Sequence, residues 1–188
     1  LAFNKLEGEL PLTLVNITKL ETLKLFSNGF TGRIPSNIGA LTNLKVLELF
    51  NNNFSGEIPS SIGSLLELEV FIASSNGLTG KLPHSMSNLK SLKVLSVFDN
   101  ALFGSVPASF GNLLELEELV LSNNGFYGNL PNELSQLTKL KTLLLSNNQF
   151  KGDFTALKSK LPNIVNFDSD NANRRSSLAT LDDDENDD

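Results

Sequence analysis

The sequence predicts an α/β solenoid with a parallel β-sheet along one face, because three kinds of residue recur at a constant step of 24 positions. Each 24-residue unit has apolar residues on one side only and cannot enclose a core by itself. Stacked units would share one continuous core. The three series are Asn4, Asn28, Asn52, Asn76, Asn100, Asn124 and Asn148; Gly8, Gly32, Gly56, Gly80, Gly104, Gly128 and Gly152; and Pro11, Pro35, Pro59, Pro83, Pro107 and Pro131.

Two periodicities alternate inside each unit and predict its elements. Leu23 and Leu25 are two apart, which is typical of one face of a short strand. A turn with the pattern Gly-x-(Ile/Leu/Val)-Pro follows, in which glycine permits the turn and proline removes a ladder donor. Ile38 and Leu41 are three apart, which favours a short 3₁₀ segment on the opposite, convex side.

Composition argues against several classes of function. The 188 residues include no cysteine and one histidine, His84, which excludes thiol nucleophiles and disulfides and disfavours a histidine metal site or triad. No apolar run of about 18 residues is present, so we expect no membrane insertion of this chain. Residues 1–170 carry 13 basic and 15 acidic residues without a basic patch, which argues against nucleic acid. We expect a protein that is not an enzyme, with no catalytic residues, cofactor or metal.

Two columns of residues are expected to be structural. A buried asparagine offers two donors and an acceptor to backbone groups where the chain leaves each strand. The expected asparagine ladder is Asn28, Asn52, Asn76, Asn100, Asn124 and Asn148. The expected second buried column is Phe30, Phe54, Leu78, Leu102, Phe126 and Phe150.

A third set of residues should point away from the core on the concave face of the sheet. Strand positions facing solvent need no aromatic or β-branched residue, yet such residues are frequent in the N-terminal and middle units, and exposed apolar surface usually marks an interaction site. The alternative is that these residues are simply good strand formers. The predicted binding face consists of Phe26, Phe50, Val70, Ile72, Val94, Phe98, Val120 and Glu48. A flanking column alternates in sign and is interpreted as structural, namely Glu21, Lys45, Glu69, Lys93, Glu117 and Lys141.

The units resemble leucine-rich repeats of the plant-specific 24-residue type, with the pattern LxxLxxLxLxxNxFxGxIPxxIxx over about residues 1–167. The resemblance implies a right-handed superhelix with a parallel concave sheet, often with a second short strand before the Ile-Pro element. Such repeats occur chiefly in the extracellular parts of receptor-like kinases and receptor-like proteins, and in secreted enzyme inhibitors. It also favours an extracellular or cell-surface location; the absence of cysteine and of a signal peptide leaves the cytoplasm as the alternative.

The ends of the chain depart from the repeat. Leu1 matches the last leucine of a strand, so we expect a fragment that lacks N-terminal material. We expect the solenoid to occupy 1–170, with about six full repeats and partial end units, and 171–188 to be a disordered acidic tail. Within that tail, Ser177 matches a basophilic kinase site; the alternative is a solvated tail. Asn16 and Asn53 begin glycosylation sequons, which Asn-rich repeats also generate by chance.

The favoured function is recognition of a protein or peptide ligand on the concave face, as part of a receptor-like protein or kinase. The first alternative is a stand-alone secreted inhibitor of a foreign enzyme. The second is a structural or surface-binding solenoid, including an ice-binding one, which would need a regular threonine array. The column Thr22, Val46, Val70, Val94, Glu118 and Thr142 does not provide that array.

Overall fold

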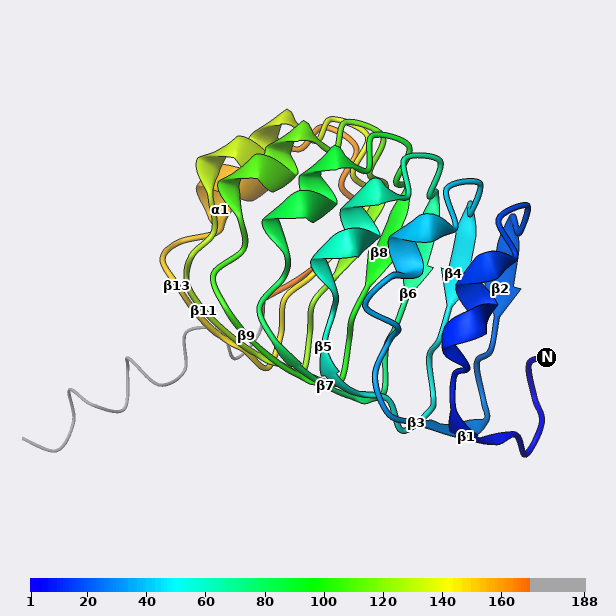
Figure 1. Cartoon of the computed structure of the whole chain (residues 1–188). Helices are drawn as coiled ribbons and strands as arrows, with labels where there is room; N and C mark the ends of the chain where they lie inside the picture. Colours follow the sequence, from blue (N-terminus) through cyan, green and yellow to red (C-terminus); the bar gives the residue numbers. More distant parts are fainter. Residues whose placement is uncertain (170–188) are drawn as a thin grey trace, which may run out of the picture.

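The protein is a curved solenoid in which successive turns of the chain stack side by side (Figure 1). The structure, a computed structural model, describes residues 1–169. The expected tail at 171–188, including Ser177, lies outside the described residues. As predicted, the architecture is a leucine-rich-repeat-type solenoid with parallel sheets and 3₁₀ turns on the convex side.

The main sheet has seven parallel strands, one from each turn of the chain. Equivalent residues of neighbouring units pair, so that the register advances by 24 positions, as between Val46 and Val70 or Val70 and Val94. The last strand contains Phe167, which pairs with Leu143 of the preceding unit. In chain order the strands are β2 (Thr22–Lys24), β4 (Val46–Glu48), β6 (Val70–Ile72), β8 (Val94–Ser96), β10 (Glu118–Val120), β12 (Thr142–Leu144) and β14 (Asn166–Asp168).

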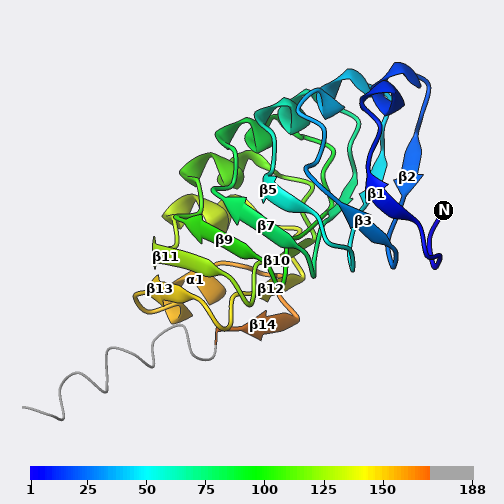
Figure 2. The ribbon, with the colours of Figure 1, turned by 60° about the horizontal axis from the view of Figure 1, so that its bottom comes forward.

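A second layer of parallel strands runs along one flank of the solenoid (Figure 2). Here the register advances by 22 positions rather than 24, so that Ser55 pairs with Gly77 and Thr79 with Ala101. A slip of two residues, roughly 6–7 Å along a strand, slants these strands across the stack. The strands are β1 (Glu7–Glu9), β3 (Gly29–Thr31), β5 (Ser55–Glu57), β7 (Gly77–Gly80), β9 (Ala101–Gly104), β11 (Gly125–Asn129) and β13 (Gln149–Lys151).

The repeated glycine is needed because of its backbone conformation. At all seven positions φ lies between +73° and +97°, a region that residues with a side chain disfavour. At Gly80 space is also short, because a Cβ placed there would lie 2.7 Å from Cγ of Glu57 in the preceding unit, whereas at Gly8 and Gly128 nothing lies within 4 Å.

The convex side carries short 3₁₀ segments in the first six turns and one α-helical turn in the last. In five of the six the residue before the segment is the repeat proline, as with Pro83, whose φ of −63° and ψ of 131° lead the chain out of the extended conformation. The segments are η1 (Leu12–Asn16), η2 (Ile38–Ala40), η3 (Ser60–Ser64), η4 (His84–Asn88), η5 (Ala108–Asn112), η6 (Asn132–Gln136) and α1 (Thr155–Lys158). Where Thr155 replaces the proline, it donates from its N–H (2.8 Å) and its hydroxyl (2.6 Å) to Oδ1 of Asp153, and α1 begins there.

One continuous hydrophobic core fills the space between the layers. The second buried column lies in it, with ring centroids of Phe30 and Phe54 6.1 Å apart and those of Phe126 and Phe150 at the same spacing. The centre of the stack is shielded from solvent, since Leu47, Leu95 and most other core leucines have no exposed surface. The main sheet is thereby fixed on its inner side, and its outer side is left for other contacts.

Candidate functional site

The outer face of the main sheet brings most of the predicted binding residues onto one surface. Register places Val70 beside Val94, and Glu48 beside Ile72, on adjacent strands. Val70, Ile72, Val94 and Val120 are each half-buried. The apolar part of this face therefore covers strands β4 to β8 and reaches the end of β10, whereas Glu118 at the start of β10 is exposed and polar.

The aromatic residues of the predicted face lie just beyond the strands. Phe26 and Phe50 stack in parallel, with centroids 4.4 Å apart and planes inclined by 6°. Phe3 meets Phe26 edge to face at 5.0 Å, so that three rings form one row at the N-terminal end. Phe98 stands apart from this row because Ser74 occupies the equivalent position in the unit between them.

Two serines at positions equivalent to Phe26 and Phe50 in later units are buried. Only 8% of the area of Ser74 and 5% of that of Ser122 is exposed. The hydroxyl of Ser74 lies 2.7 Å from that of Ser96, a neighbour on β8. Ser74 lies between Phe50 and Phe98 in this column, so the series of aromatic residues is interrupted rather than continuous.

Glu48, predicted as a ligand-binding residue, is held in an ion pair. Its Oε1 lies 3.0 Å from Nζ of Lys24 on the neighbouring strand, and its side chain is only 13% exposed. Pairing supplies the partner that a partly buried carboxylate needs. On this face Glu48 and Lys24 form a polar pair at the edge of the apolar area.

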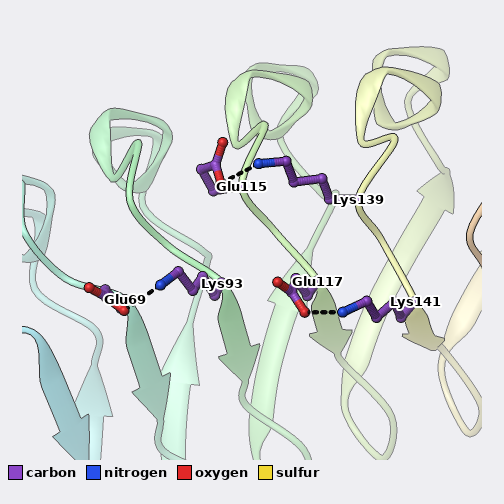
Figure 3. A network of polar contacts seen from close by, with 6 residues as sticks. All are labelled: Glu69, Lys93, Glu115, Glu117, Lys139 and Lys141. Carbon is purple, nitrogen blue, oxygen red and sulfur yellow. Dashed lines mark hydrogen bonds and ion pairs between the residues drawn. The ribbon is translucent and has the colours of Figure 1, made fainter.

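The flanking column of alternating charge resolves into separate pairs. Each lysine is bonded to the glutamate of the preceding unit, at 2.9 Å for Lys45–Glu21, 2.6 Å for Lys93–Glu69 and 2.5 Å for Lys141–Glu117. A parallel pair that the sequence analysis did not single out, Lys139–Glu115, lies beside them at 2.5 Å (Figure 3).

The hydrogen bonds of these ion pairs also shift the pKa values of the paired groups. The hydrogen bond from Lys141 lowers the pKa of Glu117, and the hydrogen bond from Lys45 lowers the pKa of Glu21. The pKa of Lys45 is raised in turn by its bond to Glu21. Because all of these groups face solvent, each pair contributes little to stability and acts mainly on register.

The asparagine column satisfies backbone groups of two neighbouring units. In a typical member, Nδ2 of Asn100 donates to the carbonyl oxygens of Ala73, Val97 and Phe98 at 3.0 to 3.2 Å, and its Oδ1 accepts the N–H of Leu78 at 3.0 Å. Burial is less complete than expected. Asn52 and Asn148 are buried, at 8% exposed each. The half-buried members are Asn28, Asn76, Asn100 and Asn124.

A conformational feature before each asparagine was not anticipated. The residue that precedes the ladder position has a positive φ of 51° to 56° in all seven units. Four of them are asparagine or aspartate, which tolerate this conformation and could have signalled it, and two are serine. The exception is Phe3, whose aromatic ring takes part in the row described above. The residues are Phe3, Ser27, Asn51, Ser75, Asp99, Asn123 and Asn147.

The remaining sequence candidates lie away from the concave face. Asn16 closes η1 and Asn53 precedes β5, and both are exposed. His84 begins η4 on the convex side and is exposed. Within residues 1–169, no group of three or more histidines and carboxylates is placed to hold a metal ion, and no helix has the length and apolarity to cross a bilayer.

Comparison with known proteins identifies the repeat. A model described as a leucine-rich repeat region matches residues 35–179, and a single leucine-rich repeat matches residues 19–41. Comparison with curated proteins gave no match. Among solved structures, the ectodomain of the receptor kinase GASSHO1/SCHENGEN3 from Arabidopsis thaliana, in complex with CASPARIAN STRIP INTEGRITY FACTOR 2, is 47% identical over 78% of this chain and 18% of that one, with a TM-score of 0.76.

Two further structures are similar over most of this chain. The Arabidopsis receptor kinase HAESA, in complex with the peptide hormone IDA and the co-receptor SERK1, is 37% identical over 89% of this chain and 28% of that one, with a TM-score of 0.85. A plant ice-binding protein is 25% identical over 89% of this chain and 62% of that one, with a TM-score of 0.75. This chain thus spans less than a third of either receptor ectodomain, and on the match to residues 35–179 it belongs to the leucine-rich repeat family, in which it resembles the ectodomains of plant receptor kinases.

Proposed function

We propose that this chain is a recognition module, part of a receptor-like protein or kinase, which binds an extended peptide or a protein loop on the outer face of its main sheet. The observation that carries the proposal is the apolar area on strands β4 to β8, with Val70, Ile72 and Val94 at its centre and the Phe26–Phe50 stack at its side. These side chains contribute nothing to the core on the other side of the sheet, and they remain partly open to solvent.

The dimensions of the face suit an extended segment that runs across the strands. Seven strands at about 4.8 Å separation span about 29 Å between the first and the last. An extended peptide advances about 3.3 Å per residue, so eight or nine residues would cross the whole sheet. Apolar side chains of such a segment would lie over β4 to β8, and polar ones over Glu118, Thr142 and Asn166.

The likeness to receptor ectodomains supports this proposal, since two of the similar proteins were solved with CASPARIAN STRIP INTEGRITY FACTOR 2 and with the peptide hormone IDA. The likeness to an ice-binding protein lends less support to ice binding here. Aligned with β4, β6, β8 and β10, the first outward column has valine or glutamate rather than threonine.

The proposal is tested by selecting binders from a displayed library of random dodecapeptides and measuring their affinity by calorimetry. We expect the double substitution Phe50→Ser/Phe98→Ser to weaken binding at least tenfold, as loss of aromatic anchors does. The matched control is Phe103→Ser/Tyr127→Ser, which removes two exposed aromatic residues from the flanking sheet and should leave affinity unchanged.

A second variant guards against loss of folding. Val70→Thr/Val94→Thr keeps the β-branched shape and strand propensity of both side chains and replaces one methyl group of each with a hydroxyl. If selected peptides bound all these variants as well as the native protein, while circular dichroism showed them folded, the outer face of the main sheet would not be the binding site.

A further inference from the structure

The last turn of the solenoid leaves a cavity that no other part of the described chain fills. It has a volume of about 270 Å³ and lies between the turn around η6 and the turn around α1. The cause is the break in the repeat: Thr155 replaces proline, and α1 replaces the 3₁₀ segment, so this turn cannot stack on η6 as the earlier turns stack on each other.

The lining of this cavity combines apolar and cationic residues. Leu130, Phe154 and Leu157 supply apolar surface, and Lys151 and Lys160 supply two ammonium groups. The lining also contains one carboxylate, Asp153. Both of its oxygens accept the hydroxyl of Thr155, at 2.6 and 2.7 Å, which turns that charge toward α1. The hydroxyl and N–H of Thr155 also lower the pKa of Asp153, so it stays ionised.

The two cavity lysines differ from their neighbours in having no partner. Residues 139–160 hold five lysines and one acidic residue. Lys139 and Lys141 are paired with glutamates, and the Nζ of Lys158 lies 5.3 Å from the centre of the Phe167 ring. The ammonium groups of Lys151 and Lys160 have no hydrogen bond or ion pair within residues 1–169. This end of the solenoid therefore carries uncompensated positive charge beside an apolar floor.

We propose that this cavity is a carboxylate-binding site, and that its occupant is the segment 181–188 of the same chain. That segment is Leu181 followed by seven residues of which six are acidic. An apolar residue followed by acidic ones complements a lining that contains both apolar and cationic residues. Charge-assisted bonds from lysine to carboxylate are among the stronger hydrogen bonds in proteins.

The site lies within reach of this segment. Two residues before Ser169, the ring of Phe167 on β14 lies 5.3 Å from Nζ of Lys158 on α1, and Ala156 and Leu157 of the same helical turn line the cavity. Asp182 lies thirteen residues after Ser169, and thirteen residues span up to about 43 Å when extended. Because the segment is tethered, its effective concentration at the site is of millimolar order, which suffices for a weak electrostatic contact.

The chain offers a direct test because it has no cysteine. A nitroxide attached through Asn186→Cys would broaden the amide resonances of residues near the docked segment in the full-length protein. We expect the amides of Asn132, Ser135 and Ala156 to lose most of their intensity, and those of η1 and η2 to keep it. The substitution Lys151→Gln/Lys160→Gln should abolish the effect, and raising NaCl to about 0.5 M should weaken it.

Two controls decide the origin of any broadening. Lys5→Gln/Lys19→Gln removes the same charge from exposed lysines at the N-terminal end and should change nothing. The second control is a mixture of two proteins, one labelled with ¹⁵N and free of nitroxide, the other unlabelled and carrying the nitroxide. Broadening of amide resonances in this mixture reports contacts between molecules. Uniform or absent broadening, equal sensitivity to both lysine pairs, or broadening in the mixed sample would each overturn the proposal.

Discussion

Phe71 and Ala73 stand two residues apart on the inner side of the third full unit, and neither has any exposed surface. Four of the other five core units have leucine at both equivalent positions, as with Leu47 and Leu49, and the unit after this one has leucine and valine. One unit thus combines a larger and a smaller residue where its neighbours use two of similar size. Since packing density in a core is close to that of a crystal, we infer that the Phe71 ring uses space that the short Ala73 leaves open.

This inference predicts strong coupling between the two positions. Ala73→Leu alone should overpack the unit and cost about 1–3 kcal/mol, and Phe71→Leu alone should leave a void. The double substitution restores the pattern of the other units and should be more stable than the sum of the two changes by about 0.5–3 kcal/mol. Urea unfolding of the four proteins measures this difference, and strict additivity would contradict the inferred compensation.

Removing one asparagine side chain from the ladder should destabilise the solenoid. Asn100→Ala leaves the N–H of Leu78 without its acceptor, so we expect a loss of about 1–3 kcal/mol. The carbonyl oxygens of Ala73, Val97 and Phe98 each lose one donor and keep another. Asn4→Ala serves as the matched control. Asn4 is exposed, and its side chain donates to the carbonyl oxygens of Leu1 and Ala2 at the end of the chain, so its replacement should have a much smaller effect on the urea midpoint.

A methyl group at Gly111 should be poorly tolerated. A Cβ there would lie 2.5 Å from the carbonyl oxygen of Glu133 in the next unit, so backbone must move, and we expect a cost of about 1–3 kcal/mol for Gly111→Ala. The equivalent position in the following unit is Ser135, which already accommodates a side chain. Ser135→Ala should therefore change the melting temperature little, and equal effects of the two substitutions would contradict this explanation.

The charge pairs predict a pH dependence with a definite sign. Lys141 lowers the pKa of Glu117 in the folded protein, so the contribution of this carboxylate to stability is present above its unfolded pKa of about 4.3 and is lost as pH falls through the folded value. Lys141→Met should raise the pKa of Glu117 toward that ordinary value, as measured by carbon NMR of its carboxyl group. Lys45→Met, which removes the partner of Glu21 instead, should leave the pKa of Glu117 unchanged.

Much of the architecture could be predicted from the sequence because a repeat states each structural requirement several times. The step of 24 residues, the paired leucines and the Gly-x-(Ile/Leu/Val)-Pro turn specify strand, turn and 3₁₀ segment in each unit. Local chemistry alone explains these features, since glycine, proline and asparagine have conformational and hydrogen-bonding properties that hold wherever they occur.

The tertiary structure decided what depends on contact between units. Only stacking shows that the flanking strands slip to a register of 22, that Ser74 is covered, that Glu48 pairs with Lys24, and that the last turn leaves a cavity beside Lys151 and Lys160. The repeat pattern gives the phase of each unit but not the angle at which one unit meets the next. That angle results from the packing of all side chains together, and it determines which outward residues become a surface and which are covered.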